Sequence, residues 1–229
     1  MRKEREQRSV LAVFARAPKA GEVKTRLART LGDEGAAELY RAMLRDVLAG
    51  AQSVAESLAD MKVMVFHTPL DAFERQSDSL RLFWPGARQP QAEGDLSARL
   101  FNCFQVLRDK GFGRIVAIGS DAPDLPTEIL ARAFSVLNDH ELVFGPAQDG
   151  GFYLMGASCA VSSHWFRDVQ WSSSSALNDI LTNLRSETFA LLPPWSDVDD
   201  EGDVRALRKR LRSGQSIAPQ TYRVLDGAR

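Results

Sequence analysis

The chain has 229 residues, 44% of them hydrophobic and 26% charged, which is typical of a globular protein with one medium-sized core. Its formal net charge is −1, so no overall field attracts nucleic acid or an anionic membrane, and any phosphate site must be a local cluster. The two cysteines lack zinc spacing, and no apolar run is long enough for a signal peptide or a membrane helix. We therefore expect a cytoplasmic protein that neither binds nucleic acid nor inserts into a membrane.

Short apolar runs and amphipathic helical patterns alternate from the first strand to the last helix. In chain order we predict a strand at Ser9–Ala15, a helix from Asp33 to Leu48, a strand at Met61–Phe66, a short helix at Leu70–Ser77, an edge strand at Arg81–Trp84, a helix at Leu96–Arg108, a strand at Arg114–Ile118, a helix at Thr127–Leu137, strands at Leu142–Phe144 and Phe152–Met155, a helix at Leu177–Leu184, a strand at Phe189–Leu192 and a helix at Val204–Leu211.

This alternation indicates an α/β fold with a mainly parallel sheet covered by helices on both faces. We expect residues 9–212 to form one domain, residues 1–8 to be disordered, and residues 213–229 to form an irregular tail. Ligands of such sheets bind beyond the carboxyl ends of the strands, so the loops that follow Ala15, Ile118, Phe144 and Leu192 are the candidate site.

A basic loop follows the first predicted strand. It contains the turn residues Pro18 and Gly21, and within eleven residues it places four cations, Arg16, Lys19, Lys24 and Arg26, beside Thr25. Such donors, with the N–H groups of the next helix, suit a polyphosphate, although a solvated basic loop would have the same composition. The loop has neither the Walker A spacing nor a GxGxxG motif, which excludes a P-loop and a Rossmann dinucleotide site.

Aspartates follow two of the other predicted strands. Asp121 comes directly after the strongest strand, where a carboxylate can hold Mg²⁺ or Mn²⁺ against phosphate, whereas Asp124 stands among prolines as a turn former. Near the carboxyl terminus, the segment 197–203 carries five acids. We assign Asp197 and Asp199 to the metal and Asp203 to the N-terminus of the following helix.

Three further segments are weaker candidates. Asp149-Gly150-Gly151 is consistent with a close backbone approach to a ligand and equally with a hairpin turn. Asp95, after Gly94, could contribute to the nucleotide site or simply cap a helix. Trp171 precedes a serine run that could be a cap segment or a lid on the acceptor side.

In this order, the segments FARAPKAGEVKTRL, EGDLSARL, AIGSDAPDLP, FGPAQDGGFYLMG, WSSSS and DVDDEGD resemble the bacterial DUF2064 family of GT-A-fold, glycosyltransferase-like proteins, related to the nucleotide-diphospho-sugar transferases. The KTRL segment is also similar to the KSRL segment of phospholactate guanylyltransferases. The matching segments run from Val13 to about Asp203. The sequence departs from the family pattern at Ser97, where the family often has Gly, and at Asp200, where it often has Thr.

The resemblance implies a three-layer α/β/α nucleotide-binding fold with a divalent metal, Mg²⁺ or Mn²⁺. By motif, Lys24 and Arg26 match the phosphate-contacting loop, Asp121 matches the metal-associated acid, and Asp149, Gly150 and Gly151 match the acceptor-side stretch. Arg16, Lys19, Gly21, Thr25, Gly94 and Asp95 complete the expected nucleotide site, and Trp171 the acceptor side.

We expect a metal-dependent transferase that uses an activated nucleotide and a small-molecule acceptor, with Lys24 neutralising the leaving phosphate and Asp149 as the acceptor base. Glycosyl transfer from a nucleotide sugar ranks first. Nucleotidyl transfer from a nucleoside triphosphate, with release of pyrophosphate, is close behind. A third alternative, a nucleotide-binding regulator without catalysis, stays open because a fold does not fix a function.

Overall fold

The computed structural model describes residues 8–74, 79–212 and 217–227 of the chain, so residues 1–7 of the expected disordered segment lie outside the described residues. Within these ranges, seven strands form one sheet. The strands are β1 (Ser9–Arg16), β2 (Met61–Thr68), β3 (Arg88–Pro90), β4 (Arg114–Ile118), β5 (Leu142–Pro146), β6 (Phe152–Ala157) and β7 (Phe189–Leu191). The helices are α1 (Thr25–Ser57), α2 (Leu96–Asp109), α3 (Thr127–Val136), α4 (Ala176–Asn183), α5 (Glu201–Arg212) and α6 (Pro219–Gly227), with short 3₁₀ turns η1 (Leu80–Leu82) and η2 (Ser163–Phe166).

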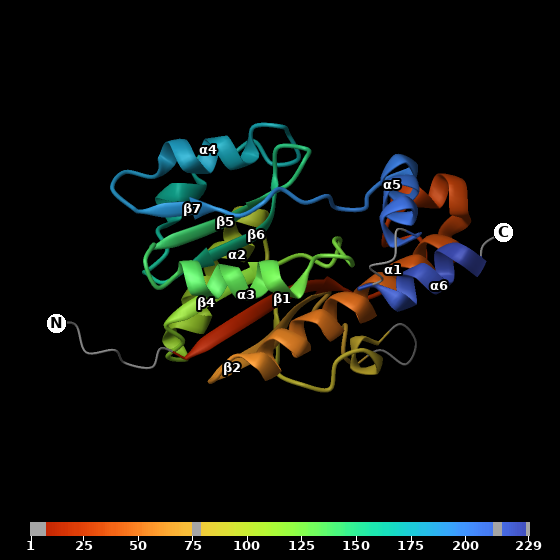
Figure 1. The fold of residues 1–229 in the computed structure, drawn as a ribbon, viewed down its shortest axis with the longest axis horizontal. Coiled ribbons are helices and arrows are strands. Elements are labelled where there is room, and N and C mark those ends of the chain that lie inside the picture. The colour runs from red at the N-terminus through yellow and green to blue at the C-terminus, as the bar shows by residue number, and fades with distance from the viewer. Residues whose placement is uncertain (1–7, 75–78, 213–216, 228–229) are drawn as a thin grey trace.

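The sheet has the strand order β3-β2-β1-β4-β6-β5-β7, and only β6 runs antiparallel to its neighbours among the described strands (Figure 1). The chain leaves β1 for β2 on one side and later returns to β4 on the other side. The loops after β1 and β4 therefore diverge at the carboxyl edge of the sheet, which is where α/β sheets bind ligands.

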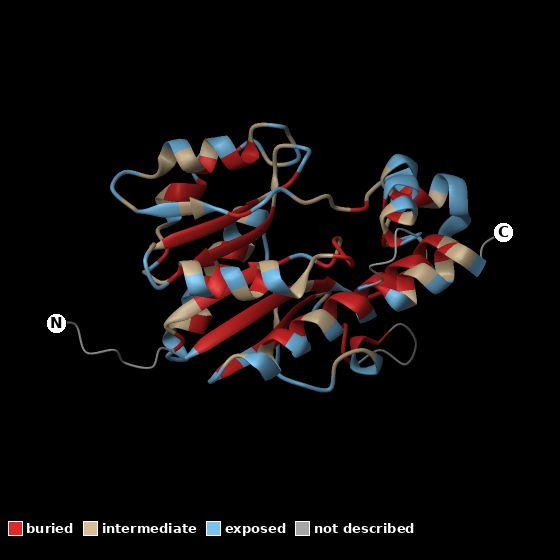
Figure 2. Cartoon of the chain, in the orientation of Figure 1, coloured by how far each residue is buried: buried red, intermediate tan, exposed pale blue. Residues whose placement is uncertain are grey.

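Helices cover the sheet on both faces, which confirms the predicted α/β class (Figure 1). Side chains of α1 and α3 pack on one face with Leu11, Val13 and Val116 of β1 and β4. Side chains of α2 and α4 pack on the other face with Val10 and Ala12. The strands β1 and β4 are buried from both faces, as their continuous apolar sequences predicted (Figure 2).

A third apolar cluster lies beyond the carboxyl edge of the sheet and joins the beginning of α1 to α5 and α6. It contains Leu27 and Met43 of α1, Leu207 of α5 and Leu225 of α6. The buried carboxylate of Asp46 in α1 also holds α6, because it accepts hydrogen bonds from the backbone N–H of Gln220 (3.1 Å) and from the backbone N–H and hydroxyl of Thr221 (both 2.7 Å). Asp46 therefore satisfies first-turn N–H groups that α6 cannot satisfy itself.

Residues 217–227 correct the prediction of an irregular tail, because they include the helix α6, which packs against α1. The residue that holds its N-terminus, Asp46, lies far away in the sequence, so no local pattern contains this contact.

The edge strand predicted at Arg81–Trp84 is also wrong. Leu80–Leu82 forms a 3₁₀ turn in which Ser79 Oγ accepts the N–H of Arg81 at 3.2 Å, and the actual edge strand is Arg88–Pro90. The helix predicted at Leu70–Ser77 is a series of turns as far as Glu74, and its remainder lies outside the described residues.

The first long helix begins earlier than predicted, at Thr25. Gly32, with φ 70° and ψ 165°, interrupts it, so the helix predicted from Asp33 corresponds to its second part. The first part is short and its local pattern is weak, but Leu27 is fully buried against α5 and α6. Across the described residues, no helix combines the length and the apolar character needed to cross a membrane.

We expect Asp46→Ala to lower the free energy of unfolding by roughly 2 to 3 kcal/mol, because it leaves two backbone N–H groups and one hydroxyl without their charged acceptor. Hydrogen exchange should show lost protection first in α6. Urea unfolding measures the stability, and Glu34→Ala, at an 83% exposed side chain of the same helix α1, is the control. Equal stability of the two variants would contradict this role of Asp46.

Candidate functional site

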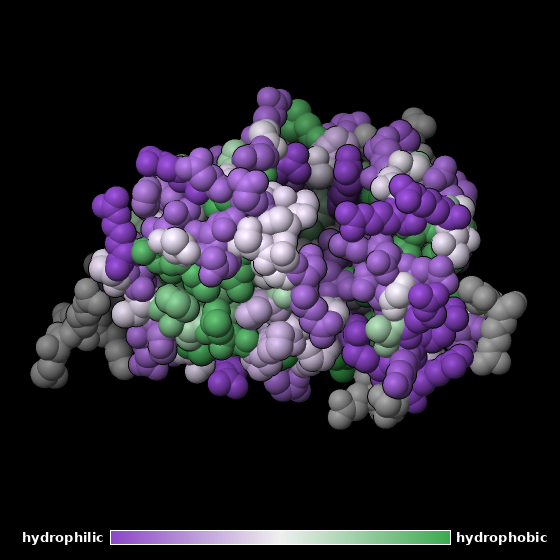
Figure 3. Space-filling view, turned by 90° about the horizontal axis from the view of Figure 1, so that it is seen from above, coloured by the Kyte–Doolittle hydropathy of each residue, from purple (hydrophilic) through white to green (hydrophobic). Residues whose placement is uncertain are grey.

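A polar cleft of about 480 Å³ lies at the carboxyl edge of the sheet, over the ends of β1, β2 and β4. The space-filling view shows the surface hollowed near its centre, beside the α5–α6 end of the molecule, with hydrophilic side chains around the hollow (Figure 3). The predicted site residues that line the cleft are Arg16, Lys24, Thr25, Arg26, Asp121, Asp149 and Asp199. The structure thus brings together residues from loops that are up to 183 positions apart, from Arg16 to Asp199.

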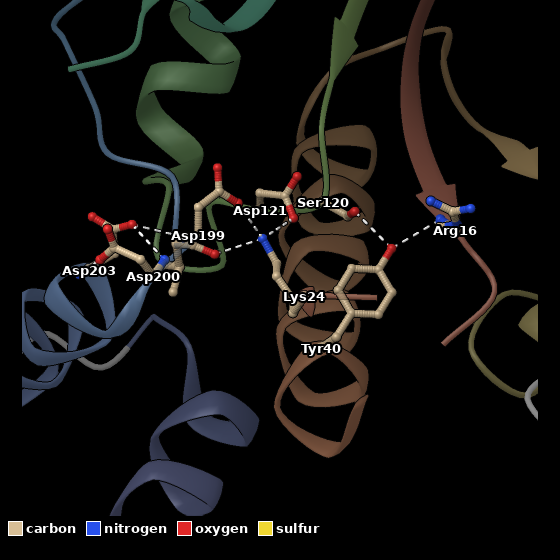
Figure 4. A network of polar contacts seen from close by, with 9 residues as sticks. Arg16, Lys24, Tyr40, Ser120, Asp121, Asp199, Asp200 and Asp203 are labelled. Atoms are coloured by element: carbon tan, nitrogen blue, oxygen red, sulfur yellow. Dashed lines mark hydrogen bonds and ion pairs between the residues drawn. The ribbon is translucent and has the colours of Figure 1, made fainter. Parts of the chain in front are cut away.

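Lys24 is the centre of the polar network at this cleft (Figure 4). Its ammonium nitrogen lies 2.5 Å from Asp121 Oδ1, 2.9 Å from Asp199 Oδ1 and 2.6 Å from the carbonyl oxygen of Val198. Only 6% of the Lys24 side chain is exposed, against 41% for Asp121 and 48% for Asp199. Because an ammonium group has three N–H donors, all of them are used. Lys24 therefore connects the loop after β1 to the loop after β4 and to the segment before α5, and it lies beneath the two accessible carboxylates of Asp121 and Asp199.

The electrostatics of this contact keep Lys24 charged. Burial by itself lowers the pKa of Lys24, but the charges of Asp121 and Asp199 and their hydrogen bonds outweigh it, and the net shift is upward. The position also requires an unusual backbone, since Lys24 has φ 47° in the left-handed region. This conformation turns the chain from the loop after β1 into α1.

Tyr40 fixes the ends of β1 and β4 to α1 (Figure 4). Its hydroxyl accepts the backbone N–H of Arg16 at 3.0 Å and lies 2.9 Å from Ser120 Oγ. Burial and the nearby charge of Asp121 raise the pKa of Tyr40, so the phenol stays neutral. The sequence placed Tyr40 on the apolar face of a helix, and its hydroxyl gave no local signal of a second role.

The basic residues of the loop after β1 separate into two groups. Arg16 and Arg26 line the cleft, and neither guanidinium group has a partner within the described ranges. Lys19 instead forms an ion pair with Glu22 and does not line the cleft. Gly21 has φ 77° and lies beside Asp33, where it turns the loop rather than facing the cleft. Two cations are thus accessible to an anion in the cleft.

Asp197 lies next to the cleft, in a recess that also contains Phe14, Asp121 and Tyr153. Burial, followed by the charges of Asp121 and Asp199, raises the pKa of Asp197 from 3.8 to about 7, against a smaller opposing effect of Lys24. Asp149 contributes further in the same direction. In the part of the chain that the structure describes, no three acidic, histidine or cysteine side chains converge closely enough to hold a metal ion by themselves.

The remaining acids of the segment 197–203 serve a helix. Asp203 Oδ2 accepts the N–H groups of Asp199 and Asp200 (both 2.9 Å), and Asp200 Oδ1 accepts the N–H of Asp203 (3.0 Å). This reciprocal capping at the start of α5 confirms the prediction for Asp203 and gives Asp200 a structural role.

Asp124 is also structural, as predicted. Its buried carboxylate accepts two N–H groups of Arg210, at 2.6 and 3.2 Å, and the indole N–H of Trp195 at 3.3 Å.

Two of the weaker candidates, Asp95 and Trp171, make contacts of their own. Asp95 caps α2, because its Oδ1 accepts the N–H of Ala98 at 3.0 Å, and neither Gly94 nor Asp95 lines the cleft. Trp171 donates its indole N–H to Ser97 Oγ at 2.8 Å and contacts Phe152 edge to face. The serine at the position where the family often has glycine therefore anchors the tryptophan.

The glycines after Asp149 form the turn between β5 and β6. Gly150 has φ 90°, and a Cβ atom there would lie 2.1 Å from the carbonyl oxygen of Ser174, so only glycine fits. Asp149 Oδ1 accepts the N–H of Gly151 at 2.9 Å. The hairpin interpretation is therefore correct, and the turn also places Asp149 at the cleft.

The residues of the cleft that were not predicted as site residues include Thr68, Gln91 and Arg99. Gln91 immediately follows the short strand β3, and Arg99 lies in the EGDLSARL segment. The presence of an arginine one turn after a helix cap was the available signal for Arg99.

A family model described as "Uncharacterized protein conserved in bacteria (DUF2064)" matches residues 51–173, more than half of the chain. No curated protein matches the chain in sequence. A solved structure from Desulfovibrio desulfuricans G20, named as a putative nucleotide-diphospho-sugar transferase, is 28% identical, with a TM-score of 0.86 over 96% of this chain and 95% of that chain.

More distant solved structures share the fold. A 4-diphosphocytidyl-2C-methyl-D-erythritol synthase from Anaerococcus prevotii DSM 20548 is 8% identical, with a TM-score of 0.57 over 90% of this chain and 99% of that chain. A CMP:2-keto-3-deoxy-manno-octonic acid synthetase complexed with CTP is 11% identical, with a TM-score of 0.55 over the same two shares, 90% and 99%. The chain thus has the fold found in nucleotide-sugar transferase and nucleotidyltransferase structures.

We expect Asp197 to make stability depend on pH. Because its pKa is about 7 when folded and 3.8 ordinarily, the folded protein retains a proton that the unfolded chain releases between these values. The stabilisation that this proton gives the folded protein is full below pH 4 and is lost as the pH rises towards 7. Above pH 7 the stability no longer changes on account of Asp197. In EDTA, Asp197→Asn should therefore raise the melting temperature more at pH 8 than at pH 5. The exposed Asp139→Asn is the control, and an equal effect of Asp197→Asn at both pH values would contradict the assignment.

Proposed function

The chain belongs to the DUF2064 family of bacterial proteins, and we propose that it is a metal-dependent transferase acting on an activated nucleotide. The arrangement that carries the proposal is a pair of accessible carboxylates, Asp121 and Asp199, facing a cleft that also contains the guanidinium groups of Arg16 and Arg26. A polyphosphate with a divalent cation complements both kinds of charge. The likeness to a structure named as a nucleotide-diphospho-sugar transferase, at 28% identity, supports the same ligand class.

In this proposal the phosphates bind at the N-terminus of α1. Thr25 and Arg26 begin this helix at the cleft, and no side chain of the described residues caps its first turn. Its first N–H groups are therefore open to an anion. Arg16 approaches from the end of β1, and Arg26 adds the second guanidinium group. Lys24, whose donors are all used, positions the two carboxylates and balances their charge, instead of the direct phosphate contact that its sequence motif suggested.

The acidic residues fit Mg²⁺ or Mn²⁺ of the kind that takes one or two protein carboxylates and completes its coordination with phosphate oxygens and water. Asp121 and Asp199 supply accessible oxygens, and Asp197 is near enough to both for their charges to raise its pKa. The excess of negative charge over the single Lys24 ammonium is the observation that favours a cation here. When bound, the cation would offset the charge on the leaving phosphate.

For glycosyl transfer, a hydroxyl oxygen of the acceptor attacks the anomeric carbon of a nucleotide sugar. The bond from that carbon to the β-phosphate oxygen breaks, and the nucleoside diphosphate leaves with the electron pair. Asp149, exposed at the cleft, takes the hydroxyl proton through the carboxylate oxygen that is not bound to Gly151. Arg16 and Arg26 stabilise the leaving diphosphate.

Nucleotidyl transfer is the second candidate. It is favoured by Arg16 and Arg26, which have no side-chain partner among the described residues, since a triphosphate carries more negative charge than a diphosphate. Here an acceptor phosphate oxygen attacks the α-phosphorus. The bond to the bridging oxygen of the β-phosphate breaks, and pyrophosphate leaves with the electron pair. The similar folds of two enzymes that make cytidylyl products are consistent with this chemistry.

We expect nucleotide binding to raise the melting temperature in the presence of Mn²⁺ and to lose this effect in Asp121→Asn. Arg26→Met should weaken binding about tenfold, the effect of one lost charged hydrogen bond. Arg29→Met, at an exposed arginine of α1 outside the cleft, should bind like the wild type. Stabilisation independent of metal would contradict the role of Asp121.

Turnover separates the candidates. Release of nucleoside diphosphate from UDP- or GDP-sugars supports glycosyl transfer, and release of pyrophosphate from a nucleoside triphosphate with a sugar phosphate supports nucleotidyl transfer. If the protein binds a nucleotide in a metal-dependent way but releases neither product with any acceptor tested, the result would instead support a nucleotide-binding regulator.

A further inference from the structure

We propose that Gln91 and Arg99 form a nucleobase-recognition subsite in the part of the cleft over β2, and that Gln91 selects a base edge that presents an N–H donor. This inference rests on the proposed function, because it requires a nucleotide in the cleft. It assigns a specificity role to two residues outside the basic and acidic segments, and its basis is the hydrogen bonding around the Gln91 amide.

The orientation of the Gln91 amide is fixed by two backbone carbonyl groups. Its Nε2 lies 2.9 Å from the carbonyl oxygen of Phe66 in β2 and 3.5 Å from that of Ala15 in β1. Rotating the amide by 180° would place Oε1 against two other oxygens, with no hydrogen between them, so the nitrogen must face the strands. The backbone N–H of Gln91 is also held, by the carbonyl oxygen of His67 at 2.8 Å.

The same two contacts determine what Gln91 can offer a ligand. An amide NH₂ group has two hydrogens: the Phe66 carbonyl oxygen accepts one at 2.9 Å, and the Ala15 carbonyl oxygen is a longer contact at 3.5 Å that keeps the nitrogen turned towards the strands. Because the nitrogen faces the strands, Oε1 is the amide atom on the opposite side, towards a ligand, and it can only accept. Its single partner among the described residues is Arg99 Nη1 at 3.5 Å, which is long for a hydrogen bond. A carbonyl oxygen has room for a second donor.

Arg99 places donors beside this acceptor. Its Nε donates to the carbonyl oxygen of Gly94 at 3.0 Å, which holds the guanidinium group near the start of α2. Nη2 has no partner within the ranges that the structure describes. The two side chains together present one acceptor next to at least one donor. A nucleobase edge, in which N–H donors and ring or carbonyl acceptors alternate, is complementary to this pair.

The order of groups along the cleft places the base at this end. The carboxylates of Asp121 and Asp199 lie beyond β4, Arg16 ends β1, and Gln91 lies over the ends of β1 and β2. Because β1 lies between β4 and β2 in the sheet, the sequence across the cleft is acid, cation and amide. A nucleotide bound with its phosphates at Arg16 and its reacting end at the acids extends its nucleoside towards Gln91.

The test compares nucleotides with a ligand that has no base. The probes are ADP, GDP, CDP, UDP and inorganic pyrophosphate, each titrated by calorimetry in the presence of Mg²⁺. Nucleoside diphosphates are suitable because nucleotide sugars and nucleoside triphosphates both contain this group. We expect Gln91→Leu and Arg99→Leu each to weaken binding of the preferred nucleoside diphosphate about tenfold and to level the differences among the four bases. Pyrophosphate affinity should stay at the wild-type value, and Gln105→Leu, at an exposed glutamine of α2, should change neither.

Arg99→Leu keeps the test decisive if Gln91→Leu loosens the strand ends, because Arg99 does not hold β1 or β2. Unchanged affinities and base preference in Arg99→Leu and in folded Gln91→Leu would overturn the proposal, as would an equal loss for pyrophosphate and nucleotides. A wild-type protein that binds pyrophosphate but no nucleoside diphosphate would overturn the proposed function itself, which is a different result from a base preference that survives the substitutions.

Discussion

The contact on which the site depends is the buried ammonium group of Lys24. It joins the loop after β1 to the loop after β4 through Asp121, and to the segment before α5 through Asp199 and the Val198 carbonyl group. An isolated ammonium group would be costly to bury, and here three acceptors surround it. In return, it holds two partly exposed carboxylates close together, which their mutual repulsion would otherwise oppose.

The rest of the molecule keeps the three loops in register. Tyr40 links the ends of β1 and β4 from the side of α1, and Asp124 fastens α5 to the loop after β4 through Arg210. Asp46 fastens α6 to α1, and α5 and α6 share an apolar cluster with the beginning of α1. These contacts are buried or partly buried and lie around the cleft. The cleft is thus bordered by a sheet edge on one side and by a small helical cluster on the other.

Charge is distributed unevenly along this cleft, and this distribution shapes its chemistry. Carboxylates gather beyond β4, where they raise the pKa of Asp197, and the guanidinium groups of Arg16 and Arg26 lie nearer α1. At the ends of β1 and β2, Gln91 offers a fixed neutral acceptor. Metal, phosphate and nucleoside each have a suitable environment, in an order that matches the connectivity of a nucleotide. The net charge of −1 conceals this local order completely.

The sequence by itself determined the fold class and most of the strands, because continuous apolar runs and helical periodicity are local properties of the chain. It also assigned Asp203 to a helix start, and it offered a cap for Asp95 and a hairpin turn at Gly150 as alternatives to ligand contacts, because these hydrogen bonds or backbone requirements involve near neighbours. Only the tertiary structure decided that Lys24 is enclosed by carboxylates, that Gln91 faces two strand ends, and that residues 219–227 are helical. Each of these depends on partners distant in the sequence, which a local pattern does not contain.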